Sequence, residues 1–138
     1  MAGDTGQMVT ERVEVVDRAR ATVLIVDDDR TIVEVLRTAL EDEGYTVFAG
    51  LNEAALALAR QEQPSVILLD LMMPGMDGVE LCRRLRADPA TAHIPIVALS
   101  AARNLAALAG QMPIDDRLPK PFDLDDISAV VARWTRPR

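Results

Sequence analysis

The chain has 138 residues, of which 49% are apolar and 27% are charged, which is the length and composition of one globular domain. Its formal charge of -7, with no basic stripe to offset it, disfavours direct binding to nucleic acid or to anionic lipid. A single cysteine and a single histidine exclude a disulfide framework and a Cys/His metal centre, so any metal must be bound by oxygen.

Residues 1–20 are polar and charged and follow neither the helical nor the strand period, which predicts a flexible N-terminal arm ahead of one folded domain over 21–138. This arm lacks the apolar stretch of a signal peptide, and the apolar runs further along are too short to cross a bilayer. We therefore expect a cytoplasmic protein without a membrane partner.

Two patterns alternate after the arm. Short runs rich in β-branched and other apolar residues predict five strands, at 22–27, 45–49, 65–70, 94–100 and 115–119. Segments with helical spacing predict helices between and after them, at 30–43, 53–62, 78–87, 102–111 and 124–134. The first helix should bury one apolar face, made of Ile32, Val35, Leu36, Ala39 and Leu40.

Several helix ends carry recognisable signals. Gly44 is placed to end the first helix, because glycine readily adopts the left-handed backbone conformation found just past a helix. Asn52 is the predicted N-cap of the second helix. Asp123, followed three positions later by Asp126, predicts a capping-box-like start for the last helix.

The predicted strands are apolar throughout rather than alternating, which indicates burial on both faces and therefore a parallel sheet covered by helices. Five strand–helix units with right-handed crossovers predict an α/β, flavodoxin-like, doubly wound fold with helices on both faces and strand order 2-1-3-4-5. Such a sheet binds its ligand beyond the carboxyl ends of the strands, at the switch point between strands 1 and 3.

Polar side chains stand at four of those strand ends. The run "VLIVDDD" ends the first strand in Asp27, Asp28 and Asp29, the third strand ends at Asp70, and the fourth and fifth end at Ser100 and Lys120. A helix cap accounts for one aspartate in such a run but not for three. Because the carboxyl ends of parallel strands share one edge, we expect these side chains to converge at the switch point.

Clustered carboxylates without histidine or thiolate suit a hard divalent cation, and a few carboxylates supplemented by water suit Mg²⁺. Without the metal, their mutual repulsion should raise at least one carboxyl pKa. A cation beside a free carboxylate, a lysine and a hydroxyl is a layout for phosphoryl transfer. In this interpretation Asp70 is the nucleophile, Asp27 and Asp28 bind Mg²⁺, and Lys120 and Ser100 contact phosphoryl oxygens.

Four motifs in order, "VLIVDDD", "VILLDLMMPGMDG", "PIVALSA" and "LPKPF", closely resemble the receiver domain of bacterial two-component response regulators, over about residues 22 to 134. The resemblance implies that Asp70 is the phosphoacceptor. It implies a magnesium site made by Asp27, Asp28, Asp70 and the backbone carbonyl of Met72. It also implies that the phosphoryl group is bound by Ser100, Ala101 and Lys120.

The resemblance further implies a cis peptide between Lys120 and Pro121, and it leaves Asp29 as a helix cap. The phosphoryl donor would be a histidine kinase or a histidine phosphotransfer protein. Phosphorylation would repack the face formed by residues 102–111, the fifth strand and the last helix, which would contact a downstream protein or a second copy of the chain. Such a protein is a phosphoacceptor switch rather than an enzyme, and we expect a stand-alone receiver.

The resemblance places the switch positions at Ser100 and Arg117. Arg117 departs from the family pattern, because many receivers carry there an aromatic residue that turns inward. An arginine cannot enter an apolar slot without a partner, so an aromatic rotamer switch is unavailable at this position. Met72 and Ala102, which border the path of the hydrolytic water in this family, carry no acid or amide to orient it. We therefore expect slow to moderate autodephosphorylation.

Two other functions remain as alternatives. Arg117 favours a receiver-like interaction module that works without phosphorylation, whereas the complete set of aspartates, serine and lysine argues against it. A phosphatase of the haloacid-dehalogenase kind would need an Asp-x-Asp pair, and the sequence Asp70-Leu71-Met72 lacks the second acid.

Overall fold

In a computed structural model of the chain, the described residues are 21–73, 76–101, 103, 105, 107, 110 and 112–135, and the arm predicted at 1–20 lies outside them. A five-stranded parallel sheet has the order β2-β1-β3-β6-β7. Its strands are β1 (Thr22–Val26), β2 (Thr46–Ala49), β3 (Val66–Asp70), β6 (Ile96–Ala101) and β7 (Asp116–Lys120). This is the predicted order 2-1-3-4-5, because the labels β4 and β5 belong to a separate small hairpin.

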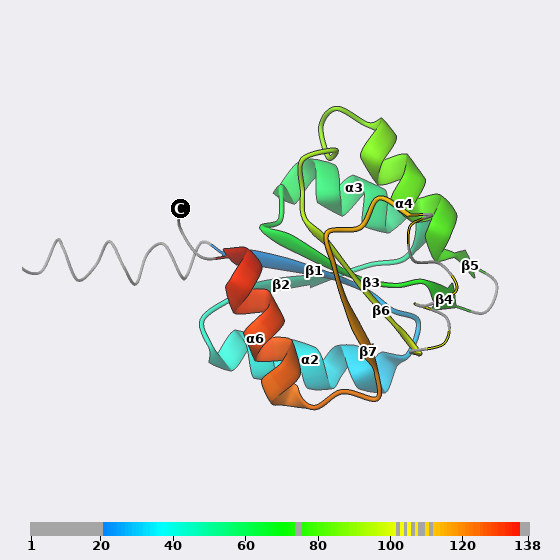
Figure 1. The fold of residues 1–138 in the computed structure, drawn as a ribbon. Coiled ribbons are helices and arrows are strands. Elements are labelled where there is room, and N and C mark those ends of the chain that lie inside the picture. The colour runs from blue at the N-terminus through cyan, green and yellow to red at the C-terminus, as the bar shows by residue number, and fades with distance from the viewer. Residues whose placement is uncertain are drawn as a thin grey trace, which may run out of the picture.

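Helices cover both faces of the sheet, as predicted (Figure 1). On one face lie α3 (Asn52–Glu62) and α4 (Gly78–Ala87), and on the other lie α2 (Arg30–Asp42) and α6 (Leu124–Thr135). Of the helix predicted at 102–111, the described residues Arg103, Leu105 and Ala107 are helical, and the remainder lies largely outside the described residues. Within the described ranges, no helix is both long and apolar enough to cross a membrane.

Side chains of the central strands belong to two hydrophobic cores, one on each face of the sheet. In β1, Val23 and Ile25 pack with α2 and α6, whereas Leu24 and Val26 pack with α3 and α4. The strands β3 and β6 divide their side chains between the two cores in the same alternating way. This explains why the strand sequences are continuously apolar, since neither face of the sheet meets water.

Two of the three predicted helix ends are confirmed. Gly44 follows α2 with a φ of 99°, in the left-handed region, and its N–H donates to the carbonyl of Glu41 at 3.0 Å. At the start of α6 the N–H of Asp126 donates to Asp123 Oδ1 at 2.9 Å, and the N–H of Asp123 donates to Asp126 Oδ2 at 3.1 Å. These reciprocal bonds form the predicted capping box.

The prediction for Asn52 is wrong. The N-cap position of α3 is Leu51, and no side chain caps this helix end. Asn52 instead takes a φ of 51°, a left-handed conformation that asparagine tolerates better than most residues. Asparagine is common both at N-caps and at left-handed positions, so the residue type alone could not separate the two roles.

A two-stranded antiparallel hairpin follows β3 directly and was not predicted. It consists of β4 (Met72–Met73) and β5 (Met76–Asp77), with Met72 opposite Asp77 and Met73 opposite Met76. Strands of two residues are too short to show a hydrophobic period. The hairpin returns the chain to the start of α4, at the carboxyl edge of the sheet (Figure 1).

Candidate functional site

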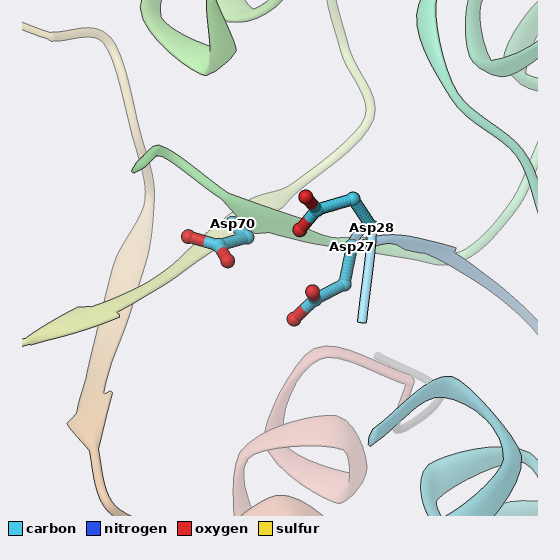
Figure 2. Close-up of side chains that lie close together, drawn as sticks. All are labelled: Asp27, Asp28 and Asp70. Atoms are coloured by element: carbon cyan, nitrogen blue, oxygen red, sulfur yellow. The ribbon is translucent and has the colours of Figure 1, made fainter. Parts of the chain in front are cut away.

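Strand register and side-chain parity place Asp27 and Asp70 next to each other. The parallel pairing of β1 with β3 ends at Val26 opposite Leu69. The residues that follow these two are Asp27 and Asp70. Both aspartates continue the side-chain row that faces α2 and α6, because their neighbours Val26 and Leu69 face the other core. Figure 2 shows these two carboxylates and that of Asp28 gathered at the strand ends.

Lys120 joins the two buried carboxylates. The strand β7 sends Leu118 toward the α2 and α6 core, so Lys120, two residues on, points to the same side. Its Nζ donates to Asp27 Oδ2 at 3.0 Å and to Asp70 Oδ2 at 3.0 Å. The three groups follow or lie on β1, β3 and β7, and Lys120 contacts both carboxylates in one site.

Backbone amides complete the contacts of the carboxylates. The N–H of Met72 donates to Asp70 Oδ1 at 3.0 Å, and the N–H of Asp29 donates to Asp27 Oδ1 at 2.9 Å. The Asp29 side chain caps α2 by accepting from the N–H groups of Thr31 and Ile32. Asp29 is therefore a helix cap, as predicted.

Burial and charge act on the site in opposite directions. Burial is the main cause that raises the pKa of Asp70, and the nearby Asp27 charge adds to it, outweighing the Met72 and Lys120 hydrogen bonds that lower it. For Lys120, burial lowers the pKa, but the hydrogen bonds and charges of Asp27 and Asp70 outweigh it and raise the pKa. The lysine is thus held as a cation. The pKa of Asp70 is raised, as predicted for one carboxyl of the cluster without its metal, but burial rather than repulsion between carboxylates is the main cause.

The carboxylates fit a small divalent cation. One oxygen each from Asp27, Asp28 and Asp70 lies within 4.8 Å of the other two, and no histidine or thiolate belongs to this group. Asp27 and Asp70 are buried and Asp28 is exposed, so the cluster opens to solvent on one side. An all-oxygen donor set of few carboxylates with access to water matches the coordination habits of Mg²⁺.

Three other predicted residues lie on β6 and β7. Ser100 is buried on β6, one residue past Leu99, and Leu99 is the register partner of Asp70. Ala101 is the register partner of Lys120. Arg117 is exposed on β7, which agrees with the expectation that an arginine does not enter the core. The peptide between Lys120 and Pro121 is cis, as the resemblance implied.

A groove beside Lys120 was not predicted. It has a volume of about 660 Å³ and runs between α2 and the chain that leads from β7 into α6. Its apolar lining includes Ile32, Val35, Phe122 and Leu124, of which Val35 is 47% exposed and Leu124 is 44% exposed. The sequence placed Val35 on the buried face of its helix. The apolar face of α2 is wider than the part of it that packs against the sheet. This excess width was the feature of the sequence that could have predicted the groove.

The fold and this site define a class: a flavodoxin-like α/β domain with an acidic cluster and a lysine at the switch point of its sheet. The model of the response regulator receiver domain family matches residues 23–132. The chain therefore belongs to the response regulator receiver domain family of two-component signalling.

Similar proteins agree with this assignment. The chain is 39% identical over 118 residues to the DNA-binding response regulator MtrA of Mycobacterium tuberculosis (strain ATCC 25618 / H37Rv), an alignment that covers 83% of this chain and 50% of MtrA. It is 40% identical over 119 residues to the response regulator PleD of Caulobacter vibrioides (strain NA1000 / CB15N), covering 84% of this chain and 26% of PleD. The chain thus spans about half the length of MtrA and less of PleD.

Solved structures give the same picture. A putative response regulator from Chloroflexus aurantiacus J-10-fl has a TM-score of 0.75 and 36% identity, covering 83% of this chain and 97% of that one. The receiver domain of the sensor histidine kinase PA1611 from Pseudomonas aeruginosa PAO1, solved with a magnesium ion in its active site cleft, has a TM-score of 0.72 and 29% identity, with 83% and 97% coverage. A phosphorylation-independent module is not favoured by these likenesses.

Proposed function

We propose that this chain is a phosphorylation-controlled switch in which Asp70 accepts a phosphoryl group from a phosphohistidine of a partner protein. Asp27, Asp28, Asp70 and the carbonyl of Met72 would hold Mg²⁺, which when bound neutralises charge on the phosphoryl oxygens. The observation that carries the proposal is the dual contact of Lys120 with Asp27 and Asp70, because it places a fixed cation beside the candidate nucleophile.

The transfer needs positioning more than covalent catalysis. An Asp70 carboxylate oxygen attacks phosphorus in line, the N–P bond of the phosphohistidine breaks, and the imidazole leaves with the electron pair and takes up a proton. Lys120 moves from its carboxylate contact to a phosphoryl oxygen, and the Ser100 hydroxyl and the Ala101 amide donate to the others. A bound divalent cation would lower the raised pKa of Asp70, since a nearby positive charge favours the ionised carboxylate.

Hydrolysis of the acyl phosphate would be slow to moderate. Met72 is exposed beside Asp70 and presents a thioether, which cannot act as a base for the attacking water. Ala102, the second residue of this prediction, lies outside the described residues. The chain would therefore assist its own phosphorylation and lose the group over time, without turnover of a substrate.

The test of the proposal uses the intact chain with acetyl phosphate as donor. With Mg²⁺ the mass spectrum should show one phosphoryl adduct per chain, and with EDTA the adduct should form far more slowly. Asp70→Asn should abolish the adduct, whereas the control Asp88→Asn, a change at a surface aspartate bound to Arg60, should leave it unchanged. An adduct that persists in Asp70→Asn, or that forms equally with EDTA, would refute the proposal.

The phosphohistidine-bearing donor would dock on the apolar groove beside Lys120. The groove ends at Lys120, whose Nζ lies 3.0 Å from Asp70, so a protein seated there is next to the reacting carboxylate. Its exposed apolar side chains, Val35 and Leu124, offer area to a partner helix. Asp123 is the acidic residue of the groove lining, and it offers a contact to a basic residue beside the apolar ridge of a partner.

Phosphotransfer from kinases tests this docking surface. Among a panel of autophosphorylated histidine kinases, the one that labels the wild-type chain fastest should label Leu124→Glu at least about tenfold more slowly. Labelling by acetyl phosphate should be unchanged, because the small donor needs no docking surface. Leu51→Glu, which charges an exposed leucine that does not line the groove, is the matched control. Equal loss with both donors would instead indicate damage to the site.

The readout face would be formed by residues 102–111, β7 and α6. Asp116 of β7 binds Arg133 and Trp134 of α6, at 2.7 Å and 2.9 Å, so the strand and helix form one surface. Arg117 is exposed on the same strand and offers a cation to a partner. A downstream protein or a second copy of the chain would read the phosphorylated state there.

A further inference from the structure

The first residue of α4, Gly78, is in direct contact with the backbone of the candidate phosphoacceptor. The hairpin β4–β5 leaves Asp70 and returns at Gly78, so residues eight positions apart meet. A Cβ at Gly78 would lie 2.6 Å from the Asp70 carbonyl oxygen, 2.7 Å from Leu71 Cα and 2.8 Å from the Leu71 carbonyl oxygen. All three are backbone atoms, so no side-chain rotation could relieve these contacts.

The Asp70–Leu71 peptide that Gly78 contacts is connected both to β6 and to Met72. The N–H of Leu71 donates to the Leu99 carbonyl at 3.3 Å, which ties this peptide to β6. The next residue, Met72, donates its N–H to Asp70 Oδ1 at 3.0 Å. Its carbonyl is also the backbone ligand of the proposed metal site. A shift of the Asp70–Leu71 peptide therefore moves both Met72 groups relative to the Asp70 carboxylate.

We propose that Gly78 is a positioning residue: its lack of a side chain lets α4 press against the Asp70–Leu71 peptide and so sets the Met72 amide and carbonyl against Asp70. The part of this inference that concerns Mg²⁺ binding rests on the proposed function. The part that concerns the Met72 amide applies to the metal-free protein. Loss of such supporting contacts weakens metal binding by about 10–100-fold in other sites.

Gly78→Ala in the full chain is the test, with Gly50→Ala as the matched control. Both replace a glycine by alanine. A Cβ at Gly50 would meet the far end of the flexible Leu58 side chain, at 2.9 Å, and no site residue. Alanine is the better helix former, so helix propensity alone would make the change at Gly78 stabilising. A loss at the site would therefore come from the backbone contacts.

Amide hydrogen exchange, resolved by NMR without Mg²⁺, is the first readout, and calorimetric titration with MgCl₂ is the second. In Gly78→Ala, the Met72 amide should exchange about tenfold faster than in the wild type. The core amides of Leu24 and Leu68 in the same spectrum should keep their relative protection. The Mg²⁺ dissociation constant should rise about 10–100-fold. Gly50→Ala should change neither quantity.

Each possible result decides the inference. Unchanged Met72 exchange in a folded Gly78→Ala chain overturns it. Equal loss of protection at Met72, Leu24 and Leu68, or loss of the helical circular dichroism signal, also overturns it, because Gly78 would then support the whole fold rather than the site. If the wild type itself binds no Mg²⁺, the proposed function fails, while the Met72 amide still reports on Gly78.

Discussion

Replacing Asp70 by asparagine should stabilise the metal-free protein. One carboxylate oxygen each from Asp27, Asp28 and Asp70 lies within 4.8 Å of the other two. At an effective dielectric constant of about 20, each like-charge pair at that separation costs about 3.5 kcal/mol, and an opposite pair 3.0 Å apart, such as Lys120 with Asp70, contributes about 5.5 kcal/mol. The attraction of Lys120 exceeds the repulsion of Asp27, so these charges on their own favour the ionised Asp70 carboxylate.

Burial of Asp70, the largest cause of its raised pKa, outweighs this attraction and leaves the ionised carboxylate with a net penalty in the metal-free folded protein. The amide in Asp70→Asn keeps the shape of the side chain and an oxygen that can accept the Met72 N–H. We therefore expect its free energy of unfolding at pH 7, without metal, to exceed that of the wild type by about 1–2 kcal/mol.

The pH dependence has a definite sign. Because the folded pKa of Asp70 is raised, the penalty is fully present above that pKa and disappears as the pH falls toward the pKa of the unfolded chain, about 4. Urea unfolding at pH 7 and at about pH 4 measures both ends of this range. Added Mg²⁺ should stabilise the wild type more than Asp70→Asn and so reduce the difference between their free energies of unfolding. An Asp70→Asn chain less stable than the wild type at pH 7 without metal would refute this reasoning.

Three further changes test the contacts that hold the fold around the site, each by urea unfolding. Asp29→Ala removes the cap of α2 and should cost about 1 kcal/mol; a loss near zero would contradict the capping role. Arg86→Leu removes donors at 2.7–2.8 Å from three backbone carbonyls and should cost about 3 kcal/mol, whereas a loss under about 1 kcal/mol would show that water replaces them. Asp116→Asn should cost about 1 kcal/mol at pH 7. Burial raises the pKa of Asp116, but hydrogen bonds from Trp134, the Arg117 amide and Arg133 outweigh burial and lower the pKa. The difference in free energy of unfolding between wild type and Asp116→Asn should therefore vanish as the pH falls through this lowered pKa. A difference that does not depend on pH would contradict this reasoning.

The strand order and the position of the acidic cluster could be predicted because both follow from local patterns. Continuous apolar runs indicate a parallel sheet, and parallel strands bring their carboxyl ends to one edge. Asp27 and Asp28 after β1 and Asp70 at the end of β3 therefore meet where expected. The cap formed by Asp29 and the glycine end of α2 depend only on neighbouring residues, and both were predicted correctly.

Features that depend on distant residues were not accessible in the same way. Arg86 contacts the carbonyls of Ala92, Ile94 and Pro113, which only the folded chain brings to one side chain. Likewise, the contact of Gly78 with the Asp70 backbone requires the hairpin, whose strands are too short to leave a pattern. Asn52 shows a different limit, since one residue type serves two local conformations.

The most direct measurement locates the phosphoryl group. After incubation with acetyl phosphate and Mg²⁺, borohydride reduction converts a phosphorylated aspartate to homoserine, and peptide mass spectrometry identifies the position. The account predicts conversion at Asp70 alone, with Asp27 and Asp28 intact. Conversion at either of those aspartates, or at none, would contradict it.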